Sequence, residues 1–468
     1  MRTAADRTLF VCLLAFLAWV PMPFGSASDA SQPFLILPPL LIGASAAILR
    51  ASWKRPFQPA DAARIWISGA VLFILVIAFQ LVPMPDAMLR AVSPRSAEVW
   101  RSASRVAALM GVRAPAMHPI TIDPDETALH LDRVLAYFAA FLSSLLLVRD
   151  RRRRTVLAAL LGAVAVFEAL YALHEAALGR YTIWGWKNTL IYGRASGTFV
   201  NPNHFGHYAA ITLPMALYLS AYAWHSAAPP GALFGRRFVR MMERQFVPFA
   251  IGLLAALACV VAVVVSESRG ALLAIAGGFA ITAAIAGTRR ALLRGTLIAV
   301  AAAAIIAATV FVLGHSKIVK RFEGSRVSEL ESRRASAAGA LRIWRMFPLF
   351  GSGAGTYEDA VVMTRAYPGD AIPNHAHDDY AEILGTTGTF GFLVSFVPLL
   401  GGFAVLSRNA LGKSGEPMSW RRRAFKAAAL TSMAIAMLHA FVDFNFFIPA
   451  NPITLAAIAG AAVAARES

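Results

Sequence analysis

Two histidines and two aspartates lie within the five residues from His375 to Asp379. An imidazole with its ordinary pKa of about 6.5 can take a proton from a hydroxyl near neutral pH. His377 is therefore a candidate general base, and Asp378 or Asp379 is a candidate to orient its ring. Two other interpretations stay open: a metal site, which would need further ligands than these, and a loop histidine without chemistry.

Two arginines lie in short polar segments between apolar runs. Arg269 lies in the turn SESRG, where Ser268 and Gly270 keep the backbone compact, and Arg194 lies in GRASGTFVNPNHFG. The planar guanidinium matches the oxygens of a phosphate, so both residues are candidates to bind a diphosphate. The alternatives are an interfacial arginine that snorkels to the membrane surface at position 269 and an ordinary polar loop around position 194.

Further polar residues are candidates to contact a substrate. Asn201, Asn203 and His204 could donate to sugar hydroxyls. Further candidates to bind the substrate are Ser268, His375, Asp378 and Arg342, the last in a segment rich in helix formers at 327–346. The following segment, PLFGSGAG, lacks the Lys-Ser/Thr of a nucleotide-binding loop, so we interpret it as a sharp turn. His439 and Asp443 are spaced to share one helix face, either as a structural link between helices or as a proton relay.

The elements that must position these residues are membrane-spanning helices. The chain has 468 residues, of which 58% are hydrophobic and 15% charged, with a mean hydropathy of +0.59. Its apolar residues form runs of about 20, the length that crosses a hydrocarbon core of about 30 Å. A β-barrel would instead show short segments of alternating polarity. We predict an all-α polytopic membrane protein with about twelve transmembrane helices in a single integral membrane domain, 1–468.

The net charge of +18 comes largely from short basic loops between the apolar runs, such as RDRRRR at 149–154. Such loops orient a membrane protein with their positive charges in the cytoplasm. We therefore expect no nucleic-acid partner, cytoplasmic termini, a retained first apolar segment and outer loops at 83–128, 179–204 and 314–379, the last one partly helical. This topology places Arg194, Arg269 and His377 on the same outer face.

The motifs GTFVNPNHFG, SRGALLA, PLFGSGAGTY and HAHDDYAEILGTTGTFGF follow one another in this order between about residues 190 and 395. Their order and spacing resemble the O-antigen ligase and Wzy-type polymerase superfamily of bacterial inner-membrane proteins. The essential histidine of that superfamily, in the pattern His-[Asn/Ser/Gln]-x9-Gly-x-x-Gly, falls on His377, with Gly388 and Gly391 at the matching spacing. Asp378 stands where the pattern has an amide or hydroxyl. The periplasmic arginines of the superfamily correspond to Arg269 and Arg194.

This resemblance implies a GT-C-like glycosyltransferase of lipopolysaccharide or exopolysaccharide biosynthesis, with neither a metal nor a cofactor. Such enzymes face the periplasm and transfer a glycan from undecaprenyl diphosphate, among the membrane lipids, to an acceptor hydroxyl. The acceptor is lipid A-core in ligases, a second lipid-linked glycan in polymerases, and a protein Ser or Thr in other relatives.

The competing function is a transporter or flippase of a lipid-linked or anionic substrate. Such a protein needs a site near the middle of the membrane that opens to both sides. Few ionisable residues lie within the apolar runs, namely Glu168, His174, Glu175, His439 and Asp443. This scarcity favours the transferase.

Overall fold

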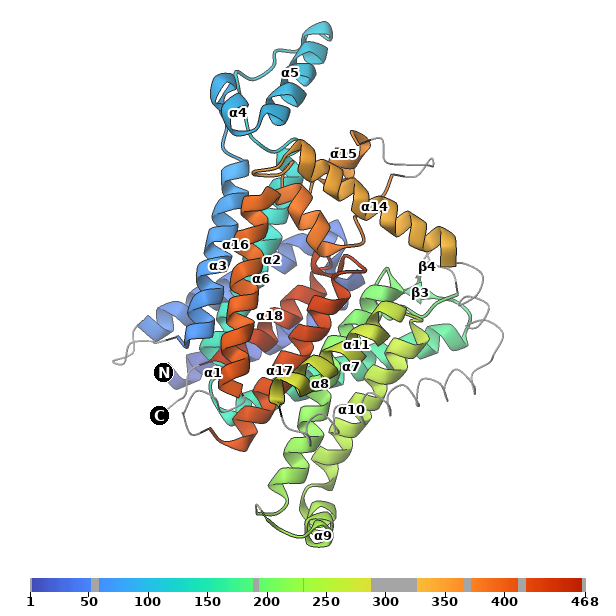
Figure 1. Ribbon diagram of the computed structural model, residues 1–468. Coiled ribbons are helices and arrows are strands. Elements are labelled where there is room, and N and C mark those ends of the chain that lie inside the picture. Colours follow the sequence, from blue (N-terminus) through green and yellow to red (C-terminus); the bar gives the residue numbers. More distant parts are fainter. Residues whose placement is uncertain are drawn as a thin grey trace.

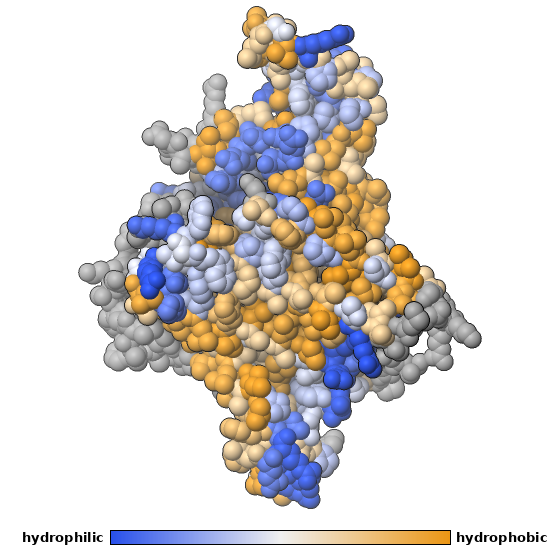
Figure 2. All heavy atoms as spheres, turned by 180° about the vertical axis from the view of Figure 1, so that it is seen from behind, coloured by the Kyte–Doolittle hydropathy of each residue, from blue (hydrophilic) through white to orange (hydrophobic). Residues whose placement is uncertain are grey.

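The computed structural model describes residues 2–51, 59–187, 193–229, 231–287, 326–364, 372–410 and 418–464. These residues form a bundle of helices (Figure 1). The strands in the described part form two short sheets of two strands each. Figure 2 shows a largely apolar surface between hydrophilic patches toward the two ends of the bundle, as expected for a protein surrounded by lipid. The predicted all-α class is confirmed.

Seven helices in the described part are long and apolar enough to cross a membrane. They are α2 (Gln32–Ala51), α3 (Asp61–Gln80), α6 (Pro124–Leu147), α7 (Arg151–Ala177), α10 (Phe246–Val265), α11 (Arg269–Ala286) and α16 (Asp379–Ala410). The chain is therefore a multi-pass membrane protein. The predicted number of about twelve spans is not confirmed, and the apolar run predicted at 296–313 lies outside the described residues.

Four more helices coincide with predicted apolar runs: α1 (Arg2–Trp19), α8 (Pro202–Ser226), α17 (Trp420–His439) and α18 (Ala450–Val463). Helix α8 packs against α7, α10 and α17, and all its residues from Pro202 to Ala216 are buried. A helix enclosed by its neighbours can carry polar residues on more than one side, since none of its faces must contact lipid. This position explains how α8 accommodates Asn203, His204 and His207.

The polar segments between the long helices are also partly ordered. The arm at one end of the bundle in Figure 1 contains β1 (Met84–Pro85), α4 (Asp86–Val92), α5 (Pro94–Leu109) and β2 (Met117–His118). The second sheet is a hairpin of β3 (Thr182–Ile183) and β4 (Trp186–Lys187). Helix α9 (Phe234–Arg244) lies between α8 and α10. Within the predicted loop 314–379, α14 (Arg326–Met346) and α15 (Tyr357–Val362) cover the end of the bundle.

A break in α16 joins these covering helices to the bundle. At Gly388 the backbone adopts φ 69° and ψ −177°, and the N–H groups of Thr389 and Phe390 donate to the carbonyls of Pro348 and Leu349. The freed carbonyls of α16 accept in turn from the N–H groups of residues 352 and 353. The PLFGSGAG segment thus replaces the missing helical hydrogen bonds, as buried backbone groups require.

Three glycines let this segment turn sharply, because Gly351, Gly353 and Gly355 have φ values of 74°, 121° and 88°. Gln80, at the end of α3, fixes the junction: its Nε2 donates to the carbonyl of Thr386 and its Oε1 accepts from the N–H of Ala354. Gln80 thus joins α3 to both the PLFGSGAG segment and the break in α16.

Candidate active site

A cavity of about 680 Å³ lies at the end of the bundle that α14 covers. It is bounded by the turn before α11, the start of α8, one face of α14, the segment before α16 and the end of α17. Its ionisable lining residues are Arg194, Arg269, Arg333, Arg334, Glu267, His377, Asp378, His439 and Asp443. The structure thus brings the three outer-face candidates, two arginines and His377, to one cavity.

His377 is held in an uncommon backbone conformation at the edge of this cavity. Its φ of 53° lies in the left-handed region, which non-glycine residues seldom adopt. Its Nδ1 lies 3.4 Å from Oδ1 of Asp443, and its ring meets that of Phe444 edge-on at 5.0 Å. The side chain is 28% exposed. The ring is therefore fixed on one side and accessible to a substrate.

Asp443 is the carboxylate around which one guanidinium and two imidazoles gather. It is 1% exposed, and its carboxylate oxygens lie 3.6 Å from Nε2 of His204 and 3.6 Å from Nη1 of Arg333. Burial alone would raise its pKa, but the imidazoles of His204 and His377 and the guanidinium of Arg333 together lower the pKa of Asp443 well below its usual range. Asp443 is therefore an ionised acceptor facing His377.

The prediction that His439 and Asp443 share a helix face is wrong. Helix α17 ends at His439, and the N–H groups of Phe441 and Val442 close turns on the carbonyls of Leu438 and His439. Asp443 caps the next N–H, that of Phe444, with its own side chain. The chain thus turns over the cavity, and Asp443 points to His377. In the sequence, the only sign that Asp443 could face His377 is that an acidic residue follows a long apolar run.

The aspartates next to His377 hold the backbone instead of the imidazole. Oδ1 of Asp378 accepts from the N–H groups of Tyr380 and Ala381 and so caps α16, and its burial raises its pKa. The buried Asp379 accepts from the N–H of Phe446, and its own N–H donates to the carbonyl of Ala440. These bonds join the segment that carries His377 to the segment that carries Asp443.

His375 is turned away from the cavity. Its Nδ1 lies 2.8 Å from Oε1 of Glu382, and its ring stacks on Phe444 at 4.2 Å between ring centres. The other oxygen of Glu382 accepts from the N–H of Ala376. Of the three predicted histidines, His204, His375 and His377, only His377 lines the cavity. In the described part of the chain, no group of three or more His, Cys, Asp or Glu residues is arranged to hold a metal ion.

Arg194 is buried and tied to two other segments. Its Nε and Nη2 donate to the carbonyl of Ser266 at 3.0 and 2.6 Å, and Nη2 also donates to Oδ1 of Asn203 at 2.8 Å. The loop that carries it is anchored by Glu168, whose carboxylate accepts from the backbone N–H and the hydroxyl of Thr198. Arg194 therefore positions the turn that carries Arg269.

The remaining predicted residues around this turn cap helices. Asn201 accepts from the N–H of Asn203 at the start of α8, and Ser268 accepts from the N–H of Ala271 at the start of α11. Arg269 follows as the first residue of α11 and lines the cavity. A Cβ at Gly270 would lie 2.5 Å from Nε2 of His439, so the close approach of α11 to α17 requires this glycine.

Helix α14 contributes different arginines from the one predicted. Arg333 and Arg334 line the cavity, whereas Arg342 is exposed and lies outside the lining. Arg342 lies about two helical turns, or about 12 Å, beyond Arg334 along the axis of α14. Which arginines of α14 reach the cavity therefore depends on how this helix crosses the bundle.

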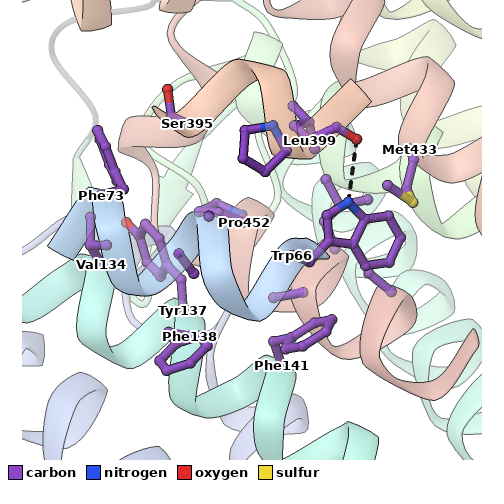
Figure 3. Close-up of a pocket in the computed structure, with 16 residues that line it drawn as sticks. Trp66, Phe73, Val134, Tyr137, Phe138, Phe141, Ser395, Leu399, Met433 and Pro452 are labelled. Carbon is purple, nitrogen blue, oxygen red and sulfur yellow. Dashed lines mark hydrogen bonds between the residues drawn. The ribbon is translucent and has the colours of Figure 1, made fainter. Parts of the chain in front are cut away.

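A second cavity, of about 270 Å³, is lined by residues of α3, α6, α16, α17 and α18 (Figure 3). Aromatic rings such as Phe73, Tyr137 and Phe141 surround it, and Nε1 of Trp66 is occupied by a hydrogen bond to the carbonyl of Leu399. Its lining residues carry no charge. This cavity suits hydrocarbon and offers no groups for acid–base or phosphate chemistry.

Arg269 and His377, which line the first cavity, lie in a stretch that matches a family model. Residues 254–396 match the family model of the O-antigen ligase. The resemblance of the sequence motifs to the O-antigen ligase and Wzy-type family is thus confirmed. The matched stretch covers just under a third of the chain. No curated protein matches the sequence.

The O-antigen ligase stretch contains the turn before α11, α14, His377 and the break at Gly388. Arg194 and Asp443 lie outside it and enter the cavity only through the fold, and His204, also outside it, approaches Asp443 from beyond the cavity lining. The match supports an enzyme of the glycosyltransferase type that acts on lipid-linked glycans in a membrane.

Proposed function

We propose that this protein transfers a glycan from undecaprenyl diphosphate to an acceptor hydroxyl, on the outer face of the bacterial inner membrane. The observation that carries the proposal is the single cavity that joins His377, its carboxylate partner Asp443 and several arginines. A base and a set of cations are the two requirements for attack by a hydroxyl with departure of a diphosphate.

The proton and bond changes follow from the placement of His377. Nδ1–H donates to Asp443, which leaves the lone pair of Nε2 to act as the base. The acceptor hydroxyl gives its proton to Nε2, and its oxygen attacks the anomeric carbon. The bond from that carbon to the diphosphate oxygen breaks, and its electron pair leaves with undecaprenyl diphosphate. Direct attack of this kind inverts the anomeric configuration.

The arginines take different parts in this reaction. Arg269 and Arg334 bind the diphosphate and stabilise the negative charge that grows on the leaving group. Arg333, 3.6 Å from Asp443, both balances that carboxylate and adds positive charge to the cavity. Arg194 acts through the turn at Ser266, because its donors already bind that turn and Asn203.

The proposal is tested with the purified full-length protein in lipid nanodiscs and a synthetic undecaprenyl-diphosphate glycan. The His377→Ala variant should bind this donor as the wild type does and should transfer its glycan far more slowly. A variant that transfers at the wild-type rate would overturn the role of His377 and favour a transporter or flippase, which needs no base.

The acceptor is tested separately in a deletion strain complemented with the wild type or with His377→Ala. Long polymer left on its lipid carrier beside bare lipid A-core, with the variant, indicates a ligase. Single unpolymerised repeat units indicate a polymerase that uses a second lipid-linked glycan.

A further inference from the structure

A third cavity, of about 260 Å³, lies at the opposite end of α17 from the candidate active site. Arg421 and Arg422 are near the start of α17, and His439 is its last residue. At 1.5 Å per residue, Arg421 and His439 are about 27 Å apart along the helix axis. The two cavities are therefore separate sites.

Five arginines line this third cavity, together with Asp150, Tyr218 and Ser419: Arg149, Arg151, Arg154, Arg421 and Arg422. They come from two basic stretches, RDRRRR before and within α7 and SWRRR at the start of α17, which are nearly 270 residues apart in the chain. As orientation signals these stretches need only be on the same side of the membrane. The orientation of the protein in the membrane does not require that they line the same cavity, so another reason for this arrangement is needed.

The arginine side chains are held in place by their surroundings. The guanidinium carbons of Arg151 and Arg421 lie 5.9 and 5.7 Å from the centre of the Tyr222 ring, and that of Arg421 lies 5.4 Å from the ring of Trp420. Nη2 of Arg154 donates to the carbonyl of Arg149 at 2.7 Å. Such contacts reduce the freedom of long cationic side chains, so the site is largely formed in advance.

The cavity lining has five arginines but a single carboxylate. Asp150 is the one carboxylate in the lining, and its oxygens serve the N–H of Arg153 and lie 3.7 Å from Nε of Arg153, whose side chain is outside the lining. The buried Nε atoms of Arg149 and Arg421 have no hydrogen-bond partner in the described part of the protein. Buried donors without acceptors are costly, and so are clustered like charges.

The N-terminal ends of two long helices also favour an anion in this cavity. Asp150 caps α7 and Ser419 caps α17, and both capping residues line the cavity. The N-terminal end of a helix favours an anion through its free N–H groups and its dipole. Guanidinium groups in addition match phosphate oxygens in shape and in hydrogen-bond number.

We propose that this cavity binds a phosphate-bearing anion, supplied either by the headgroup of an anionic phospholipid or by a free phosphate compound. Basic pockets between membrane helices commonly recognise lipid phosphates. The bound anion would link the α6–α7 connection to the start of α17 and so stabilise the fold at the end of the bundle away from the candidate active site.

The test is the midpoint of thermal unfolding of the full-length protein in a zwitterionic detergent. One series adds phosphatidylglycerol or, as its neutral counterpart, phosphatidylcholine. The other series adds inorganic pyrophosphate or sodium chloride at equal ionic strength, without lipid. We expect the midpoint of the wild type to rise by several degrees with phosphatidylglycerol or with pyrophosphate, and the series that shows the rise identifies the source of the phosphate.

Two double variants remove the same charge from the same two stretches. Arg149→Gln/Arg421→Gln removes cavity arginines and should abolish the rise. Arg152→Gln/Arg423→Gln removes exposed arginines outside the cavity lining and should retain it. The proposal fails if neither addition raises the wild-type midpoint, or if the two double variants lose the rise to the same extent.

A third variant keeps the test decisive if Arg149→Gln/Arg421→Gln does not fold. Arg149→Lys/Arg421→Lys retains both charges but lacks the two-pronged guanidinium. We expect a clearly smaller rise for this variant. A rise equal to that of the wild type would show that general surface charge is sufficient and would overturn the proposed site.

Discussion

His377 and Asp443 are 66 residues apart in the chain, yet Nδ1 of the imidazole lies 3.4 Å from Oδ1 of the carboxylate. The two residues come from separate connecting segments, which Asp379 joins through its backbone and its side chain. The contact between the proposed base and its carboxylate partner thus depends on two connecting segments that meet at the end of the bundle. Substitutions around this contact should therefore affect either the rate of glycan transfer or the stability of the fold, depending on the residue that is changed.

The His377→Ala variant should lose most of the transfer activity, because the acceptor hydroxyl no longer has a base. General-base catalysis contributes about 10²- to 10⁴-fold to a rate, and a fall in kcat of this size is expected with little change in donor affinity. The measurement is the rate of glycan transfer in nanodiscs at saturating donor. His174→Ala, at an exposed position of α7, is the matched control and should retain the wild-type rate.

The Asp443→Asn variant should be less stable at neutral pH, because it leaves Arg333 and the nearby imidazoles without their carboxylate. Breaking a buried ion pair costs about 3–5 kcal/mol. The pKa of Asp443 is lowered in the folded protein, so its ionised form contributes stability above the ordinary carboxyl pKa of about 4. That contribution is lost as the pH falls through the lowered value.

The difference in unfolding midpoint between the wild type and Asp443→Asn should therefore be largest from pH 5 upward and shrink at more acidic pH. Thermal unfolding in detergent across this range measures it. A difference that grows as the pH falls would contradict an ionised Asp443.

The Arg334→Gln variant should bind the donor more weakly, because a cavity-lining cation is removed from the phosphate. A charge-assisted hydrogen bond contributes about 1.5–3 kcal/mol, so the KM for the lipid-linked donor should rise by about tenfold or more. Arg342→Gln removes the same charge from the same helix at an exposed position outside the cavity lining. Equal KM changes in the two variants would indicate a general effect of charge on α14.

The Gly388→Ala variant should destabilise the protein strongly. Its φ and ψ of 69° and −177° lie in a region that is almost exclusive to glycine. A Cβ there would also lie 2.4 Å from the backbone of Leu349. We expect a loss of at least about 3 kcal/mol, since strain of about 1–3 kcal/mol adds to the clash, and a lower unfolding midpoint.

Gly401→Ala is the matched control in the same helix. A Cβ at position 401 would meet its nearest neighbour, Cγ2 of Ile65, at 3.6 Å, which is ordinary van der Waals contact. Alanine is favoured over glycine within a helix by about 1 kcal/mol, so the midpoint should be unchanged or slightly higher. A lower midpoint of similar size in both variants would contradict the special role of the break at Gly388.

Much of the fold follows from local patterns. Long apolar runs predicted membrane helices, and the runs that fall in the described residues are helical. The motif around His377 indicated this histidine as the candidate base. The structure places His377, but not His375, at the cavity, and its catalytic role stays a prediction. The prediction of membrane helices succeeds because hydrophobic length is a property of neighbouring residues.

The sequence by itself determined that the chain is a helical membrane protein with a conspicuous histidine before an apolar run, since hydropathy and motif spacing are local properties. Only the tertiary structure decided that Asp443, rather than Asp378 or Asp379, faces His377, and that Arg333 and Arg334 enter the cavity while Arg342 does not. Such choices depend on where α17 ends and how α14 crosses the bundle. Packing between distant segments sets both, and no local pattern records it.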